Sequence, residues 1–286
     1  MKVDCVLDAR ATVGEGAIWS VKLQCLLWVD IPAGHLNIFD PSSGDNRVIA
    51  LDRPVGCVAE TARGSVIAAL TDGFFEVDLI TGAQTRICGP ASAERGHRFN
   101  DGTTDRQGRF LAGTMPQSGP KEDVTDGTLY IYDGGQSSEI MDGFHTINGM
   151  AVSPEGTVLY ISDSFPAVRR IWAFDYDPDD AAISNRRAFF DTNTVAGRPD
   201  GATVDADGCY WMAGVSGGQL YRITPQGRVD LTIDMPVSRP TRPAFGGPDL
   251  DMLYVTSIRT EGEPLSGGVF ALRVPGVTGL PNTMAR

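Results

Sequence analysis

The sequence predicts an all-β fold, a six-bladed β-propeller with a central channel. A pattern of short apolar strands and glycine-containing turns recurs six times along the 286 residues. The copies have the spacing of propeller blades, and no long segment shows the 3.6-residue periodicity of an amphipathic helix. Short β-rich runs separated by Gly, Pro, Asp and Ser are typical of hairpins, so each copy is expected to be a small antiparallel sheet.

Each copy begins with an apolar strand, continues through a turn into a second strand, and adds further strands after it. Successive copies start 40 to 52 residues apart. Their first residues are Ala17, Cys57, Asp101, Gly149, Gly201 and Arg242. Units of about 40 to 50 residues with several strands each are typical of blades. We therefore expect residues 1–286 to form one propeller domain.

A ring of sheets must close, because an open edge strand exposes unpaired backbone groups. The N-terminal segment Asp4–Asp8 is a β-rich run outside the six copies. We expect this strand to complete the last blade beside Gly268–Arg273. The longest irregular segments, Ser118–Thr125 and Asp175–Ser184, are expected to be loops.

Composition narrows the classes of partner. The net charge is -12, and 42% of the residues are hydrophobic. The acidic balance and the lack of Lys/Arg clusters argue against nucleic acid and against anionic membranes as partners. The chain has no apolar run of about 18 residues and no signal-peptide core at its start. The five cysteines form no CxxC pair and are expected to be reduced thiols. We expect a cytoplasmic protein, and a monomer because no apolar helix or long exposed edge suggests an interface.

Polar residues stand just before the innermost strands of several copies, where the turns of a propeller meet at one mouth of its channel. Glu15, Asn148 and Asp200 are each followed directly by glycine, and Asn100 is followed by Asp101 and then glycine. Glycine there permits positive φ and close backbone approach. Single Asn-Gly and Asp-Gly pairs are also common turns, so it is the recurrence at one structural position that favours a site.

Glu15, Asn148 and Asp200 offer three hard oxygen donors, and the two carboxylates among them are anionic. Such a set suits Ca²⁺, Mg²⁺ or Mn²⁺. A zinc site would prefer Cys or His ligands, although Zn²⁺ also binds oxygen. The sequence contains no GxSxG elbow, no P-loop and no GxGxxG fingerprint that would indicate another chemistry.

At these residues the chain resembles the SMP-30/gluconolactonase/luciferin-regenerating-enzyme family, which includes regucalcin. The resemblance covers essentially the whole chain and depends on the order and joint presence of short motifs. These motifs are Gly14-Glu15-Gly16 with Trp19, Arg98–Gly102, Gly108–Met115, Ile147–Gly149, Tyr160–Asp163, Ile183–Arg187, Pro199–Gly201, Phe245–Gly247 and Leu253–Thr256.

The resemblance implies a six-bladed propeller that binds one divalent cation, Ca²⁺ in the first place, and hydrolyses a sugar lactone to the open-chain acid. It implies that Glu15, Asn148 and Asp200 bind the cation and that Asp200 is also the catalytic acid/base. Arg98 and Asn100 match positions that contact the lactone.

One position departs from the family pattern. Some members place a Glu three residues after the Gly-Thr-Met motif, where it contacts substrate. Ser118 stands there in this chain and is the candidate substrate-binding residue, with Glu122 or Asp123 as nearby substitutes. The sugar is therefore open among aldono- and aldaro-lactones.

Three other functions stay open at this point. They are a metal-dependent esterase or phosphotriesterase of the propeller type, a calcium-binding regulatory protein without turnover, and an interaction scaffold. Arg98 and Asn100 beside the metal set argue against a pure ion site, which would not need them.

Overall fold

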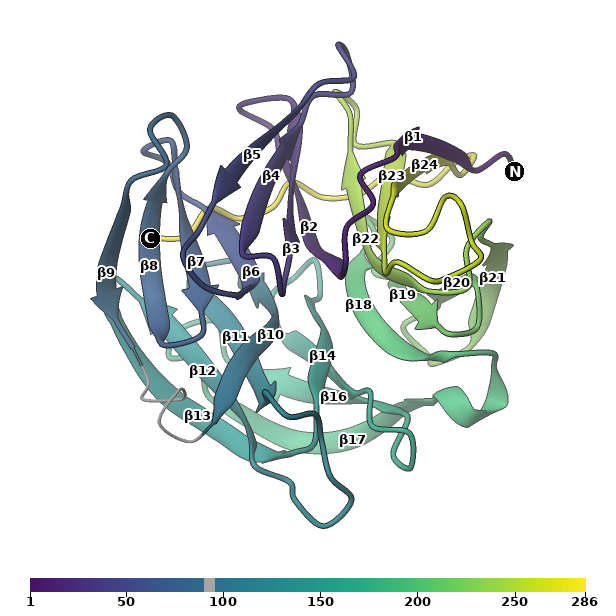
Figure 1. Ribbon diagram of the computed structural model, residues 1–286. Coiled ribbons are helices and arrows are strands. Elements are labelled where there is room, and N and C mark those ends of the chain that lie inside the picture. The colour runs from purple at the N-terminus through teal and green to yellow at the C-terminus, as the bar shows by residue number, and fades with distance from the viewer. Residues whose placement is uncertain (90–95) are drawn as a thin grey trace.

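Six four-stranded antiparallel sheets form a ring in the computed structural model, which describes residues 1–89 and 96–286 (Figure 1). One strand of each sheet faces the axis and the others follow outward to the rim. The predicted six-bladed β-propeller is therefore confirmed. All six starting residues of the sequence repeat lie in the innermost strands.

We number the blades 1 to 6 along the chain and list their strands from the axis outward. The innermost strands are β2 (Gly14–Ser20), β6 (Val55–Glu60), β10 (His97–Thr104), β14 (Ile147–Val152), β18 (Arg198–Val204) and β22 (Pro240–Gly246). The second strands are β3 (Cys25–Asp30), β7 (Ser65–Leu70), β11 (Phe110–Pro116), β15 (Val158–Asp163), β19 (Tyr210–Val215) and β23 (Met252–Ser257). The third strands are β4 (His35–Phe39), β8 (Gly73–Asp78), β12 (Gly127–Asp133), β16 (Arg170–Tyr176), β20 (Gln219–Ile223) and β24 (Val269–Arg273). The outer strands are β5 (Asn46–Ala50), β9 (Gln84–Cys88), β13 (Gln136–Phe144), β17 (Ile183–Asp191), β21 (Val229–Asp234) and β1 (Asp4–Leu7).

The N-terminal strand closes the ring, as predicted. β1 pairs antiparallel with β24, and Asp4 lies opposite Ala271 and Cys5 opposite Phe270. Blade 6 thus joins the first strand of the chain to its last three (Figure 1). This pairing covers the edge of β24, which would otherwise expose unpaired backbone groups.

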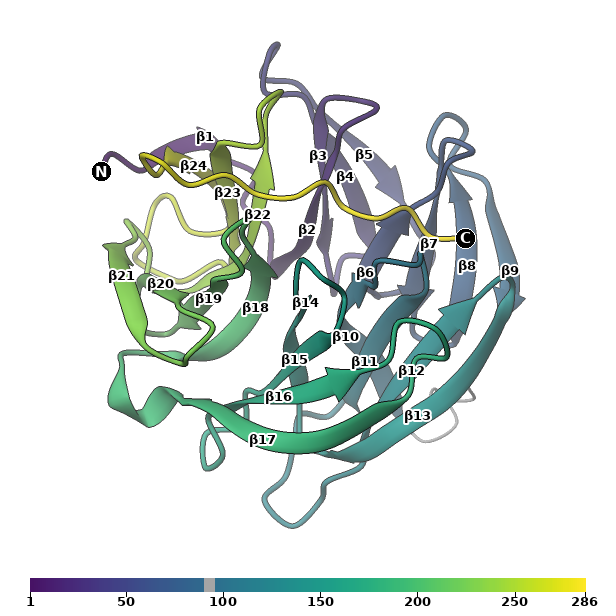
Figure 2. The same ribbon diagram turned by 180° about the vertical axis from the view of Figure 1, so that it is seen from behind.

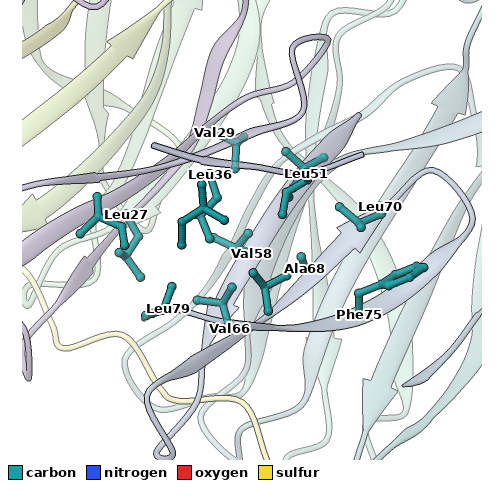
Figure 3. Packing of buried hydrophobic residues seen from close by; sticks show 14 of the residues in the cluster. Leu27, Val29, Leu36, Leu51, Val58, Val66, Ala68, Leu70, Phe75 and Leu79 are labelled. Carbon is teal, nitrogen blue, oxygen red and sulfur yellow. The ribbon is translucent and has the colours of Figure 1, made fainter. Parts of the chain in front are cut away.

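Apolar layers between neighbouring blades form the core. Figure 3 shows one such layer, in which Leu27 and Val29 of blade 1 lie near Val58 and Val66 of blade 2. Leu27 and Val29 are fully buried and stand two residues apart, so both point from the same face of β3. Each such buried side chain stabilises the fold by about 1.5–3 kcal/mol.

The two predicted loops differ in outcome. Residues 118–125 contain no strand, as predicted. The predicted loop Asp175–Ser184 is too long at both ends, because β16 ends at Tyr176 and β17 begins at Ile183. The reversal is compact because the Asp177 carboxylate accepts a hydrogen bond from the Asp179 N–H at 2.8 Å, an Asx turn that lets both strands continue closer to the tip.

The C-terminal segment crosses one face of the ring (Figure 2). The Gly279 N–H donates to the Leu250 carbonyl of blade 6 at 2.8 Å, and the Ala285 N–H donates to the Glu60 carbonyl of blade 2 at 2.7 Å. The Thr104 hydroxyl of blade 3 donates to the Thr283 carbonyl at 2.8 Å. Since Glu60 and Thr104 end their strands, this segment covers the mouth of the channel at the ends of the innermost strands.

Within the described residues, no helix is long and apolar enough to cross a membrane. All five cysteines are free.

Candidate active site

An irregularity interrupts the pairing of every innermost strand near its start. The shifts in register fall between Glu15 and Ile18, Val55 and Cys57, Phe99 and Gly102, Asn148 and Ala151, Pro199 and Ala202, and Pro240 and Pro243. A bulge twists a strand and changes the direction of its side chains. The same device recurs in all six blades, so the polar side chains at this level are turned toward the common axis.

Glycines hold two of these side chains in place. Gly16 has a φ of +58° and Gly149 a φ of +55°, a left-handed conformation that favours glycine. The N–H of each glycine donates to the side chain before it. The Gly16 N–H is 3.0 Å from Glu15 Oε2, and the Gly149 N–H is 3.0 Å from Asn148 Oδ1. The prediction that these glycines permit a positive φ is therefore confirmed at Gly16 and Gly149.

The five principal candidate residues all line one pocket of about 280 Å³ at the mouth where the innermost strands begin. Glu15 comes from β2, Arg98 and Asn100 from β10, Asn148 from β14, and Asp200 from β18. Four blades thus contribute to one site. Their convergence agrees with the sequence prediction, whereas the roles assigned to them stay predictions.

Hydrogen bonds connect these side chains to one another. Asn148 Nδ2 donates to Asp200 Oδ1. Arg98 Nη1 donates to Asn100 Oδ1 at 3.0 Å, and Asn100 Nδ2 donates to the Ile147 carbonyl at 3.0 Å. The network orients the amide groups and leaves further oxygen lone pairs and N–H groups for a ligand.

The two acidic side chains are difficult to ionise together. Glu15 and Asp200 are each only 6% exposed. Burial, together with the negative charges of Asp200 and Asp101, raises the pKa of Glu15 well above its usual value. Burial raises the pKa of Asp200 to about 7, against the hydrogen bond from Asn148 that lowers it. Two neighbouring buried carboxyls of this kind call for a positive charge between them.

A hard divalent cation fits this donor set. Glu15 and Asp200 offer anionic oxygens and Asn148 offers a neutral amide oxygen, which are the donors that Ca²⁺ and Mg²⁺ prefer. Among residues 1–89 and 96–286, no three His, Cys, Asp or Glu side chains gather as a metal cluster. The candidate set has an amide as its third donor, which favours a hard ion over a soft one.

The substrate candidate Ser118 lies apart from this group. Ser118 is exposed, as are its possible substitutes Glu122 and Asp123, and none of the three lines the pocket. Pro120 of the same loop lines the pocket instead, as does Met115 near the end of β11. The role of Ser118 stays a prediction.

Sequence reasoning assigned no role to a buried ion pair that lies close to the site. Asp101 Oδ1 is 2.5 Å from Arg242 Nη1 and accepts the Gly102 N–H at 2.8 Å, while Oδ2 accepts the Met150 N–H at 3.1 Å. Arg242 and Asp101 are both buried. The available signal was Arg242, a charged residue inside the predicted innermost strand of its copy, because a buried charge is costly unless it is paired.

Two further arginines that line the pocket were not among the predicted site residues. Arg198, at the start of β18, and Arg239, directly before β22, both line it. Their positive charges lower the pKa of Asp200. Arg198 stands two residues before Asp200 on the same strand, a spacing that places side chains on one face and that could have indicated it.

Known proteins resemble the chain along its length. Residues 13–259 match the SMP-30/gluconolactonase/LRE-like region. A 6-deoxy-6-sulfogluconolactonase from Pseudomonas putida is 38% identical over 94% of both chains. A regucalcin from Danio rerio is 34% identical over 98% of this chain and 97% of its own.

Solved structures share the fold. A luciferin-regenerating enzyme superposes with a TM-score of 0.91 at 27% identity and covers 100% of this chain and 99% of its own. A calcium-binding protein, regucalcin, from Agrobacterium tumefaciens also has a TM-score of 0.91 at 27% identity, over 99% and 96% of the two chains. The motifs, the six-bladed ring and these matches lead to one conclusion: the chain belongs to the SMP-30/gluconolactonase/LRE-like family.

Proposed function

We propose that this protein is a metal-dependent sugar lactonase that opens an aldono- or aldaro-lactone to the hydroxy acid. The family membership supports a hydrolase acting on lactones, since one relative is named a 6-deoxy-6-sulfogluconolactonase. The observation that carries the proposal is the pocket itself. It combines two buried carboxyls, an amide, and the donors Arg98 and Asn100 at one channel mouth.

Glu15, Asn148 and Asp200 would hold the cation, which when bound supplies Lewis-acid polarisation of the lactone carbonyl. Arg98 and Asn100 would donate hydrogen bonds to oxygens of the sugar and orient the ring. These side chains are tied to each other and to the backbone, so the substrate meets groups that are already positioned.

Asp200 would move the proton. As the carboxylate it accepts a proton from the water that attacks the carbonyl carbon. The ring C–O bond then breaks, and the leaving ring oxygen receives that proton from Asp200. Water is thus divided between the new carboxyl group and the new hydroxyl group, and Asp200 returns to its starting state.

A second candidate is a calcium-binding protein without turnover, favoured by the names of the regucalcin relatives. Arg98 and Asn100 separate the two candidates. A site for an ion alone has no use for a guanidinium, which repels the cation, whereas a lactone offers it several oxygens.

The test is hydrolysis of a sugar-lactone panel by metal-stripped protein, refilled with Ca²⁺, Zn²⁺, Mn²⁺ or Mg²⁺ and followed by proton release. We expect turnover to disappear on stripping and to return with at least one cation. A higher kcat/KM on aryl esters or phosphotriesters would overturn the substrate class. Cation binding with no turnover of any of these compounds would favour the non-catalytic candidate.

A further inference from the structure

The charges around the pocket do not balance. Three guanidinium groups line it, those of Arg98, Arg198 and Arg239, against the two carboxyls of Glu15 and Asp200. Three further carboxylates lie beside the pocket without lining it: Asp101 is paired with Arg242, and Asp30 and Asp163 accept backbone N–H groups. Among the side chains that line the pocket, guanidiniums therefore outnumber carboxyls, and a divalent cation between Glu15 and Asp200 would add further positive charge.

Among the described residues, the side chains of two of the three arginines have no hydrogen-bond or ion-pair partner, although both act on Asp200 through their charge. Within the described part of the chain, the side chains of Arg198 and Arg239 form no ion pair and no hydrogen bond, and the Nε of Arg239 is buried without an acceptor. Arg98, by contrast, donates to Asn100 and to the Phe99 carbonyl. An unsatisfied buried donor costs roughly 1–3 kcal/mol, so the Arg239 guanidinium is expected to meet an acceptor on a ligand, and Arg198 lines the same pocket.

We propose that the lactone carries an oxyanion substituent, a carboxylate or a sulfonate, on the end of the sugar away from the reacting carbonyl, and that Arg198 and Arg239 bind it. This inference rests on the proposed lactonase function. A guanidinium offers a planar fork of N–H donors that matches such an anion. The substituent takes no part in bond making. It anchors the far end of the sugar while Arg98 and Asn100 orient the ring.

A neutral sugar fits this arrangement less well. Its hydroxyl groups would satisfy the hydrogen bonds but would leave the extra charge uncompensated. The competing explanation is that the arginines only offset Glu15 and Asp200. That explanation requires two guanidiniums, and the pocket has three.

The test compares two lactones that differ only in the group at the far end of the sugar. D-glucono-1,4-lactone ends in a CH₂OH group, and D-glucaro-1,4-lactone ends in a carboxylate at the same carbon. A lactone with a sulfonate there forms a third arm, and the faster of the two anionic lactones identifies the natural group. For the cation-loaded protein we expect kcat/KM to be at least about 10-fold higher for an anionic lactone than for the neutral one.

Arg198→Met and Arg239→Met should each reduce this preference by about 10-fold, mainly through a higher KM for the anionic lactone. Both lactones use the same Asp200 and the same cation, so the ratio of their kcat/KM values cancels general damage to the site. Arg228→Met is the matched control. It removes an exposed arginine from blade 5, the blade of Arg198. It should leave the ratio of the two kcat/KM values at the wild-type value.

A wild-type preference for the neutral lactone refutes the inference and leaves the lactonase proposal intact, and this measurement needs no variant to fold. An unchanged ratio in both arginine variants also refutes it. Failure to turn over any lactone with any cation refutes the proposed function, and this inference with it.

Discussion

At the residue scale, the proposed chemistry depends on one carboxyl group with two tasks. Asp200 is a candidate cation ligand and the candidate proton carrier, and burial raises its pKa to about 7. That value belongs to the metal-free site, and a bound cation would favour the ionised carboxylate, the form that accepts a proton from the attacking water. Asn148 donates a hydrogen bond to one of its oxygens, which orients the carboxyl and leaves the other oxygen available.

Replacing this group should stop turnover without unfolding the protein. We expect Asp200→Asn to lower lactone kcat by at least about 100-fold, because general acid/base catalysis and the metal each contribute on that scale. Steady-state kinetics and circular dichroism check this. Asp207→Asn is the control, since Asp207 lies in the same blade with its side chain 68% exposed. Near-normal turnover in Asp200→Asn would remove Asp200 from its catalytic role.

The same carboxyl should make the metal-free protein sensitive to pH. Because the pKa of Asp200 is raised on folding from 3.8 to about 7, its contribution to stability is complete below about pH 4 and is lost as the pH rises to about 7. The loss is up to about 4 kcal/mol. We expect metal-stripped wild type to lose stability relative to Asp200→Asn over this range.

Urea unfolding at pH 4.5 and pH 7.5 measures the effect as the difference between the two proteins. Adding the cation at pH 7.5 should restore the wild type but not the variant. If the wild type and the variant keep the same difference in unfolding free energy at both pH values, the carboxyl is not buried as described.

At the scale of the element, the irregular start of each innermost strand changes the direction of its side chains and so allows polar groups to face the pocket. A regular strand would alternate its side chains between the two faces of the blade. The shift in register after Glu15 and after Asn148 interrupts this alternation, and a glycine with positive φ follows each of them.

The glycine after Asn148 should therefore tolerate no side chain. A Cβ on Gly149 would lie 2.5 Å from the Tyr210 hydroxyl and 2.8 Å from the Asp200 carbonyl. Gly134→Ala is a close control, because Gly134 has a φ of +54° with open space around it. We expect Gly134→Ala to cost about 1–2 kcal/mol for the left-handed backbone alone.

Gly149→Ala should cost clearly more than this, by about 1–3 kcal/mol of additional steric strain. Denaturant unfolding of both variants gives the two free energies. Equal losses would mean that the backbone around Gly149 moves aside and that the close packing there is not needed.

At the scale of the whole molecule, both ends of the chain tie the ring together. β1 completes blade 6, and the C-terminal segment connects blades 6, 2 and 3 across the opposite mouth from the site. The site needs six blades at fixed angles, because its residues come from strands that never pair with each other.

Removing residues 280–286 should loosen the ring without touching the pocket. The deletion loses three backbone hydrogen bonds, which are those of the Ala285 N–H, the Arg286 N–H and the Arg286 carbonyl. At about 1 kcal/mol each, the melting temperature should fall by about 6 °C or more. Differential scanning calorimetry measures the shift.

The variant Arg286→Ala distinguishes the contribution of the crossing segment from that of its terminal ion pair. It removes only the partly exposed contact with Asp133, and such surface pairs contribute about 0–1 kcal/mol. We expect a much smaller shift, of about 2 °C or less. A deletion as stable as this point variant would show that the crossing segment is not part of the closure.

The sequence by itself determined the blades, the closing strand and the five principal pocket residues. Strand alternation and turn residues are local properties, so the six repeats could be recognised without coordinates. Once a closed ring is assumed, residues before the innermost strands must meet at one mouth. Glu15 and Asp200 could therefore be placed together although 185 positions separate them.

Only the tertiary structure decided which further side chains reach the pocket. Arg198 and Arg239 line it while Ser118 does not, and the C-terminal segment covers the other mouth instead of extending a blade. Side-chain direction at a bulge, and the path of a segment without strand pattern, depend on packing between blades that are far apart in the chain. Apart from the two-residue spacing of Arg198 and Asp200, no local pattern in the sequence contains that information.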